Sequence, residues 1–178
     1  MNKITEMLMH GGIGIIATDT LYGIVGQALN HDAVQRIYAV KQRTPTKPFI
    51  ILIHDISDLA LFNVVVTQTM QESLNTYWPG PVSIILECND PSFEYLHRDT
   101  DSLAFRMPAK PEVQEILKLT GPLVAPSANP EGMPPAHDIA AARNYFGDSV
   151  DFYSEGSVND KASKIIKITG RGIEVIRP

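Results

Sequence analysis

The stretch Lys41-Gln42-Arg43-Thr44-Pro45-Thr46-Lys47-Pro48 joins a predicted helix to the apolar run at 49–53. Three cations are concentrated at this junction, where the chain passes from a helix end into a buried strand. Cations at a helix C-terminus have an ordinary explanation, because they complement the partial negative charge of the helix end. A charge cluster beside a buried strand also suits a bound anion, so we interpret the junction as the floor of an anion site.

The helix before the junction is predicted from the spacing of its apolar residues. Asn30 is a suitable N-cap, and Val34, Ile37 and Tyr38 fall on one face. Lys41 is the next member of this face. The spacing therefore predicts that the Lys41 stem is buried and that its ammonium group reaches a cleft or a counter-charge.

Composition limits the class of protein. With 178 residues, 44% hydrophobic and 20% charged, the chain is expected to form one domain over residues 1–178. A formal net charge of −5 argues against a basic surface coat, so any nucleic-acid contact must be local. Cys88 is the only cysteine, which excludes a disulfide framework and favours a reducing cytoplasm.

Targeting signals are not expected. The N-terminal residues 1–6 include an acid and lack the continuous apolar run of a signal peptide. No run approaches the roughly 18 to 20 apolar residues of a membrane span. We therefore expect no membrane association.

Strand-like and helix-like patterns alternate along the chain, which predicts an α/β fold with a mixed sheet of about seven strands. The predicted strands lie at 13–17, 24–29, 49–53, 82–86, 103–107, 123–125, 150–153, 164–168 and 173–176, and the predicted helices at 3–10, 30–41, 57–62, 67–77, 111–119 and 138–146. Residues 89–101 are predicted to form a polar loop. The last two strands are expected to pair antiparallel across Gly170-Arg171-Gly172.

Polar residues follow several of the predicted strands, where α/β sheets bind their ligands. They are Thr18, Asp19 and Thr20 after one strand, Arg106 at the end of another, and Ser127 and Asn129 after a third. Caps, turns and surface ion pairs explain each of these singly. Their joint placement favours a ligand site with cations, hydroxyls, an amide and a carboxylate.

Several kinds of site are excluded by pattern. The chain has neither G-x-x-x-x-G-K-[ST] nor G-x-G-x-x-G after a strand, so neither a P-loop nor a dinucleotide fingerprint is present. The five histidines lack metal-ligand spacing, and no protein metal site is predicted. Ser127 lacks the glycines of a nucleophile elbow.

Six motifs together resemble the YrdC-like family, which comprises the threonylcarbamoyl-AMP synthases. In order they are Thr18-Asp19-Thr20-Leu21-Tyr22-Gly23, Lys41-Gln42-Arg43, Trp78-Pro79-Gly80-Pro81, Phe105-Arg106-Met107-Pro108, Ala125-Pro126-Ser127-Ala128-Asn129 and Ile176-Arg177-Pro178. No extension follows Pro178, so the chain resembles the short single-domain branch. The fold implied is a twisted mixed sheet flanked by helices around a concave, locally positive cavity.

The resemblance implies a reaction in which L-threonine, bicarbonate and ATP give threonylcarbamoyl-adenylate and pyrophosphate. The adenylate would serve N6-threonylcarbamoylation of adenosine 37 in tRNA. A separate downstream threonylcarbamoyl transferase complex would complete that modification, so contact with tRNA would be indirect. Mg²⁺ would accompany ATP.

The resemblance also assigns residues. Lys41 and Arg43 would act in catalysis through their charge. Threonine would be held by Thr20, Arg106, Ser127 and Ser163. ATP would be contacted by Arg43, Lys47, Ser102, Asn129, His137 and Arg177. The resemblance supplies neither a general base nor a metal ligand.

Departures from the family pattern occur at Asp19, Leu52, Glu131, His137 and Lys164. Asp19 stands for a usual Glu, and Leu52 stands where longer members often have His. Glu131 and His137 replace hydroxyl residues, and Lys164 replaces a usual Thr. Two alternatives stay open: an RNA-binding YrdC-like module without synthase activity, and a carbamoyl-adenylate enzyme with a different acceptor.

Overall fold

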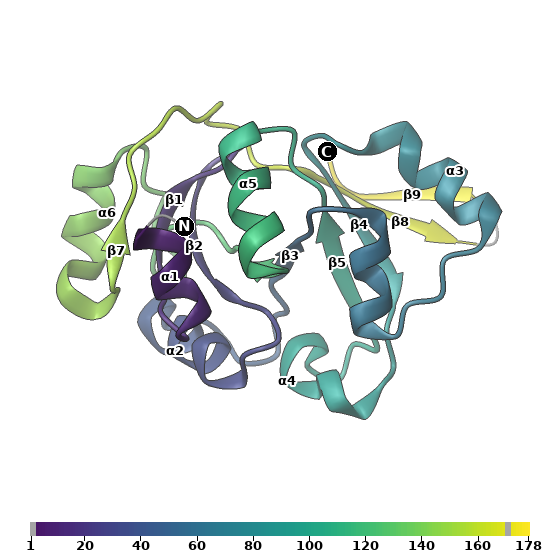
Figure 1. Ribbon diagram of the computed structural model, residues 1–178, viewed down its shortest axis with the longest axis horizontal. Helices are drawn as coiled ribbons and strands as arrows, with labels where there is room; N and C mark the ends of the chain where they lie inside the picture. The colour runs from purple at the N-terminus through teal and green to yellow at the C-terminus, as the bar shows by residue number, and fades with distance from the viewer. Residues whose placement is uncertain (1–2, 170–171) are drawn as a thin grey trace.

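The computed structural model describes residues 3–169 and 172–178, and it shows a mixed sheet flanked by helices (Figure 1). The strands are β1 (Gly14–Ala17), β2 (Tyr22–Gln27), β3 (Ile50–Leu52), β4 (Val82–Glu87), β5 (Ser102–Arg106), β6 (Leu123–Val124), β7 (Phe152–Tyr153), β8 (Lys164–Thr169) and β9 (Gly172–Arg177). The α-helices are α1 (Lys3–Met9), α2 (His31–Lys41), α3 (Gln68–Tyr77), α4 (Glu94–His97), α5 (Pro111–Thr120) and α6 (Ile139–Phe146). Short 3₁₀ helices are η1 (Ile56–Phe62), η2 (Pro91–Phe93) and η3 (Gly147–Ser149).

The sheet has nine strands among the described residues, in the order β7-β1-β2-β6-β3-β5-β4-β8-β9. Three neighbouring pairs are parallel, namely β1 with β7, β3 with β5 and β4 with β8, so the sheet is mixed as predicted. The predicted count of about seven strands is wrong. It is too low because all nine predicted strand segments, including the short β6 and β7, join the one sheet.

The two faces of the sheet carry separate apolar clusters, because side chains alternate along a strand. Ile15 of β1 belongs to the larger cluster, which also holds apolar residues of α2 and α6. The next residue, Ile16, belongs to the smaller cluster with residues of α1 and α5. Figure 1 shows α1 and α5 together in front of the strands. The sheet is therefore covered on both faces.

Helix α2 forms as its sequence predicts. The Asn30 side chain accepts a hydrogen bond from the Ala33 N–H at 3.0 Å, which confirms the N-cap. Val34 and Ile37 are fully buried, and Lys41 is only 1% exposed. The helix ends at Lys41, and its C-cap Gln42 has a φ of 50°, in the left-handed region. The chain then turns into the cationic junction.

Some predicted boundaries differ from the structure. The second strand starts at Tyr22 instead of 24, because Tyr22 pairs with Ala17 across a tight hairpin. The predicted loop at 89–101 contains η2 and α4, and Leu96 of α4 packs into the core. The β8–β9 pairing is antiparallel as predicted. Gly170 and Arg171 of its predicted turn lie outside the described residues.

None of the helices in 3–169 and 172–178 combines the length and the apolar character that a membrane crossing requires.

Replacing Asn30 with alanine should lower the free energy of unfolding by about 1 kcal/mol, because the Ala33 N–H loses its acceptor. Urea denaturation followed by circular dichroism measures this change. Asn75→Ala is the matched control, since Asn75 is exposed inside α3 and makes no side-chain hydrogen bond to a described residue. An equal loss in the two variants would contradict the capping role.

Candidate active site

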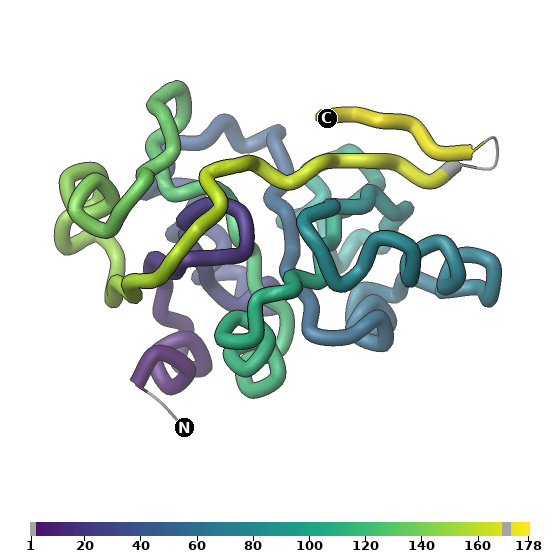
Figure 2. The backbone as a smooth tube through the Cα atoms, turned by 90° about the horizontal axis from the view of Figure 1, so that it is seen from above, coloured from purple at the N-terminus to yellow at the C-terminus, as the bar shows by residue number. Residues whose placement is uncertain are grey.

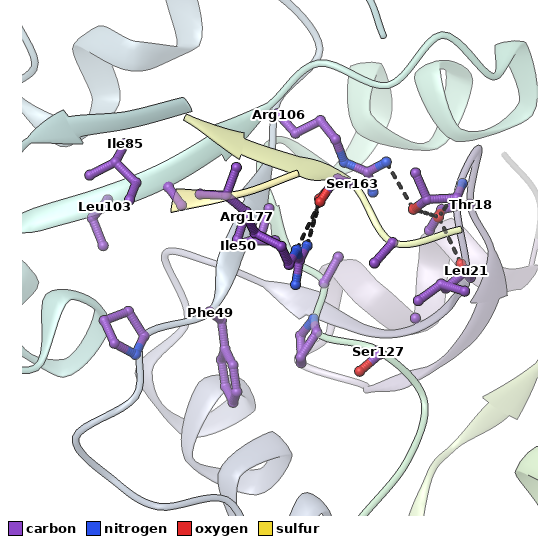
Figure 3. Close-up of a pocket in the computed structure, with 18 of the residues that line it drawn as sticks. Thr18, Leu21, Phe49, Ile50, Ile85, Leu103, Arg106, Ser127, Ser163 and Arg177 are labelled. Atoms are coloured by element: carbon purple, nitrogen blue, oxygen red, sulfur yellow. Dashed lines mark hydrogen bonds between the residues drawn. The ribbon is translucent and has the colours of Figure 1, made fainter. Parts of the chain in front are cut away.

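A cavity of about 470 Å³ lies where the β1–β2 loop, the cationic junction and strands β5, β8 and β9 meet. Three arginines, Arg43, Arg106 and Arg177, line it, and no acidic side chain of the described residues does so. Figure 3 shows Arg106 near Thr18 at one end and Ile85 with Leu103 at the other, with Arg177 between them. The cavity is therefore cationic with one apolar end.

Arg106 ends β5 and is only 3% exposed. Its Nη1 donates to Asp19 Oδ1 at 2.5 Å and to Thr20 Oγ1 at 3.0 Å. Burial lowers the pKa of Arg106, and the Asp19 carboxylate opposes that shift. The buried Nε of Arg106 has no hydrogen-bond partner among the described residues. This guanidinium therefore keeps donor capacity for a ligand.

The loop after β1 is held by its own hydroxyls. Thr18 Oγ1 donates to the Leu21 carbonyl at 2.7 Å and lies 3.0 Å from Thr20 Oγ1. Thr18 and Thr20 are both buried and line the cavity. The loop thus presents threonine hydroxyls beside Arg106.

A long connection between β7 and β8 crosses this loop, and Figure 2 shows it running over the body of the protein toward β8. Asn159 donates through its backbone N–H to the Thr20 carbonyl at 3.0 Å and through Nδ2 to the Asp19 carbonyl at 2.9 Å. Tyr22 donates its hydroxyl to the Gly156 carbonyl at 2.6 Å. The connection fastens the hydroxyl loop at the Arg106 end of the cavity.

Ser163 and Arg177 form a second group on the cavity wall. Arg177 donates to the Ser163 carbonyl at 2.9 Å from Nε and 2.6 Å from Nη2, and Nη2 also lies 3.1 Å from Ser163 Oγ. The Ser163 hydroxyl also lies 2.9 Å from Ser83 Oγ. These bonds fix the end of the connection against β4 and β9.

Arg43 forms the floor at the cationic junction. Its Nε and Nη2 donate to the carbonyls of Lys47 and Pro48, each at 3.1 Å, and its guanidinium lies 5.4 Å from the Phe49 ring centre. Tyr38 stacks on Phe49 at 4.1 Å and donates its hydroxyl to the Lys47 carbonyl at 3.0 Å. The junction is therefore a folded loop in which backbone carbonyls orient the Arg43 guanidinium.

Lys41 is buried as predicted, but its ammonium group does not line the cavity. It donates to the carbonyls of Ser127 and Asn129, each at 2.5 Å. Burial and the nearby Arg43 charge lower the pKa of Lys41 to about 7, although Glu131 acts in the opposite direction. Lys41 therefore connects the end of α2 to the loop that presents Ser127.

The loop after β6 is also fixed by side chains. Ser127 Oγ donates to Asn129 Oδ1 at 2.6 Å. Asn129 Nδ2 donates to the carbonyls of Pro130 at 2.9 Å and Met133 at 2.7 Å. Ser127 lines the cavity, whereas Asn129 is buried behind it.

The structure gathers seven of the residues assigned from sequence around the cavity: Thr20, Arg43, Ser102, Arg106, Ser127, Ser163 and Arg177. It places four outside the lining: Lys41, Lys47, Asn129 and His137. Lys41 and Asn129 hold the loop backbone, and Lys47 pairs with Glu131. The His137 side chain is 76% exposed and lies 3.3 Å from Asp138. The roles of all these residues stay predictions.

The apolar part of the cavity is missing from the sequence assignment. It is formed by Phe49, Ile50, Ile85, Leu103, Ile165 and Ile176. In the sequence these residues resemble any core strand residue. Only the folded structure shows that they come together to form an apolar wall of the cavity. Leu52, noted as a departure, is fully buried and pairs with Arg106 in the strand register.

The pH dependence of stability tests the burial of Lys41. The pKa of Lys41 in the folded protein, about 7, lies below its ordinary value of 10.5, so between these two pH values the unfolded chain binds more protons. The free energy of unfolding of wild type should thus rise by about 2 kcal/mol relative to that of Lys41→Met when the pH is raised from 7 to 9. Urea denaturation of both proteins measures it, and a difference independent of pH would contradict the lowered pKa.

Comparison with known proteins identifies the family of this chain. The Sua5/YciO/YrdC family model, described as "Telomere recombination", matches residues 6–178. Threonylcarbamoyl-AMP synthase of Pseudomonas paraeruginosa is 32% identical to this chain, and the alignment covers 97% of this chain and 94% of the relative. The synthase of Marinobacter nauticus is 31% identical, and the alignment covers 92% of this chain and 88% of that relative.

A solved structure gives the same fold. The crystal structure of P. abyssi Sua5 complexed with L-threonine superposes with a TM-score of 0.89 at 25% identity, covering 98% of this chain. This chain spans 52% of that longer one. The predicted α/β fold class and the family resemblance are thereby confirmed. The chain belongs to the Sua5/YciO/YrdC family.

Proposed function

We propose that this protein is a threonylcarbamoyl-AMP synthase, which makes threonylcarbamoyl-adenylate and pyrophosphate from L-threonine, bicarbonate and ATP. The observation that carries the proposal is the shared cavity, which has Arg106 with Thr20 at one end and Arg43 with Arg177 along its wall. An amino acid and a nucleotide could therefore meet in one space. Relatives of nearly the same length that bear this name support the reaction.

Threonine would bind at the Arg106 end. Its carboxylate would take the free donors of the Arg106 guanidinium, and hydroxyls of Thr20 and Ser127 would complete its polar contacts. Ser163 would close the site from the connection between β7 and β8. This binding would leave the threonine amine free to react with bicarbonate.

The chemistry would then depend on position and charge. The threonine amine and bicarbonate form a carbamate with loss of water, and a carbamate oxygen attacks the α-phosphorus of ATP. The bond from this phosphorus to the bridging oxygen breaks, and pyrophosphate leaves. Arg43 and Arg177 would neutralise charge that develops on the phosphate oxygens. The adenine would occupy the apolar end near Ser102 and Leu103.

Lys41, Asn129 and Lys47 would act from outside the cavity lining. Lys41 and Asn129 hold the backbone of the Ser127 loop, so we assign them to positioning. Lys47 would meet the distal phosphates at the rim. His137 is exposed near this loop and would contact ATP only from its outer side.

The wider setting follows from the proposed reaction. Mg²⁺ would enter with the triphosphate, because this ion is usually held in part by substrate phosphates. The product would pass to a threonylcarbamoyl transferase complex that acts on adenosine 37 of tRNA. Residues 1–178 would form the single domain needed, in the cytoplasm.

Pyrophosphate release tests the proposed function. Release from ATP should require both bicarbonate and L-threonine, and serine in place of threonine serves as the control. Release with serine but not threonine would indicate a different acceptor. ATP binding without release under any of these conditions would favour an RNA-binding module without synthase activity.

Ser127→Ala should weaken threonine binding by about 1–3 kcal/mol, because a buried hydrogen bond to the ligand is lost. Isothermal titration calorimetry measures this affinity. Ser149→Ala is the matched control, because Ser149 is exposed in η3, away from the cavity lining. Unchanged threonine affinity in Ser127→Ala would remove this hydroxyl from the site.

A further inference from the structure

Glu131 makes an unusual set of contacts at the cationic junction. Its carboxylate accepts the Thr44 backbone N–H at 2.5 Å and the Thr44 hydroxyl at 3.0 Å, and it pairs with the Lys47 ammonium group. A backbone N–H, a hydroxyl and an ammonium group that converge on one anion form a donor set well suited to phosphate oxygens. The Glu131 carboxylate thus occupies a preformed anion-binding site made by Thr44 and Lys47, called the seat below.

The backbone around this seat is fixed, whereas the carboxylate is not. The Glu131 N–H donates to the Lys41 carbonyl at 2.8 Å, and Lys41 in turn holds the carbonyls of Ser127 and Asn129. The Lys47 side chain is 55% exposed and that of Glu131 is 24% exposed. The pair is open to solvent on the Lys47 side, so a competing anion can reach its donors while the Glu131 backbone stays in place.

The seat lies at the rim of the cavity. Arg43 and Pro48, which lie on either side of Thr44 and Lys47 in sequence, both line the cavity, and so does Pro135 from the loop that follows Glu131. A nucleotide in the cavity would extend its phosphate tail toward this rim. The phosphate tail and the carboxylate are both anionic, so they cannot share the seat.

The charge state of Glu131 is compatible with this role. Hydrogen bonds from Lys47 and from the Thr44 N–H lower the pKa of Glu131 to about 2. The carboxylate is therefore ionised at neutral pH and competes with phosphate as an anion.

We propose that Thr44 and Lys47 form the seat for the terminal phosphates of ATP and for pyrophosphate, and that Glu131 occupies this seat until the phosphates displace it. The inference rests on the proposed function and deepens it. It assigns Thr44 to nucleotide binding and makes Glu131 an internal competitor for the triphosphate. AMP, which lacks the terminal phosphates, would not compete with Glu131.

Calorimetric titration of Glu131→Gln with ATP, pyrophosphate and AMP tests this inference. Glutamine keeps the size and one acceptor oxygen but loses the charge, so ATP and pyrophosphate should bind about fivefold tighter, with AMP unchanged. Glu115→Gln is the charge-matched control, since Glu115 is exposed on α5 and does not line the cavity. This control should bind all three ligands as wild type does.

Thr44→Val provides a second, opposite test. It removes the hydroxyl donor and keeps the backbone N–H, so ATP and pyrophosphate should bind more weakly while AMP is unaffected. If wild type binds ATP but Glu131→Gln binds it no tighter, the inference is overturned and the proposed function stands. If neither wild type nor the variants bind ATP, both are overturned.

Discussion

The Lys41 ammonium group connects the two parts of the chain on which the site depends. A buried charge without partners would be costly, and Lys41 meets this constraint through two backbone carbonyls. The bond joins the end of α2 to the loop after β6. Arg43 lies just beyond Lys41 in sequence, and Ser127 lies at the other end of the bond. These bonds, together with that from the Glu131 N–H to the Lys41 carbonyl, therefore help to set the separation of Arg43 and Ser127 across the cavity.

The sequence predicted the burial of Lys41 but not its partners. The helical period placed its stem on the apolar face of α2, and the structure confirms this. Carbonyl acceptors leave no mark in the sequence, because every residue has one. The sequence therefore could not show that Lys41 holds the loop after β6, and only the structure reveals this role. The same limit applies to Asn129, whose amide also bonds to backbone.

Strand and helix patterns predicted the α/β class, because β1 and β2 are short runs that are buried almost throughout and β5 is largely buried. The patterns also located the short strands β6 and β7, but they did not show that all nine strand segments join one sheet, because pairing partners leave no periodic signal in the sequence. Contacts across long sequence distances were also hidden. Asn159 donates hydrogen bonds to the Asp19 and Thr20 carbonyls from the connection between β7 and β8. That connection has no periodic apolar residues that would predict its position. Family motifs located Thr20 and Arg106, while folding brought them together.

The partners of each cation decide how much positive charge the cavity offers. Arg106 is paired with Asp19, so its charge is largely balanced, and it offers directed donors to a ligand. Arg43 and Arg177 instead donate to carbonyls, which orient them without cancelling their charge. Neutral acceptors thus preserve a positive wall in a chain with a formal net charge of −5. An anionic ligand bound in the cavity would neutralise the positive charge of Arg43 and Arg177, which no acidic side chain among the described residues of the cavity lining balances.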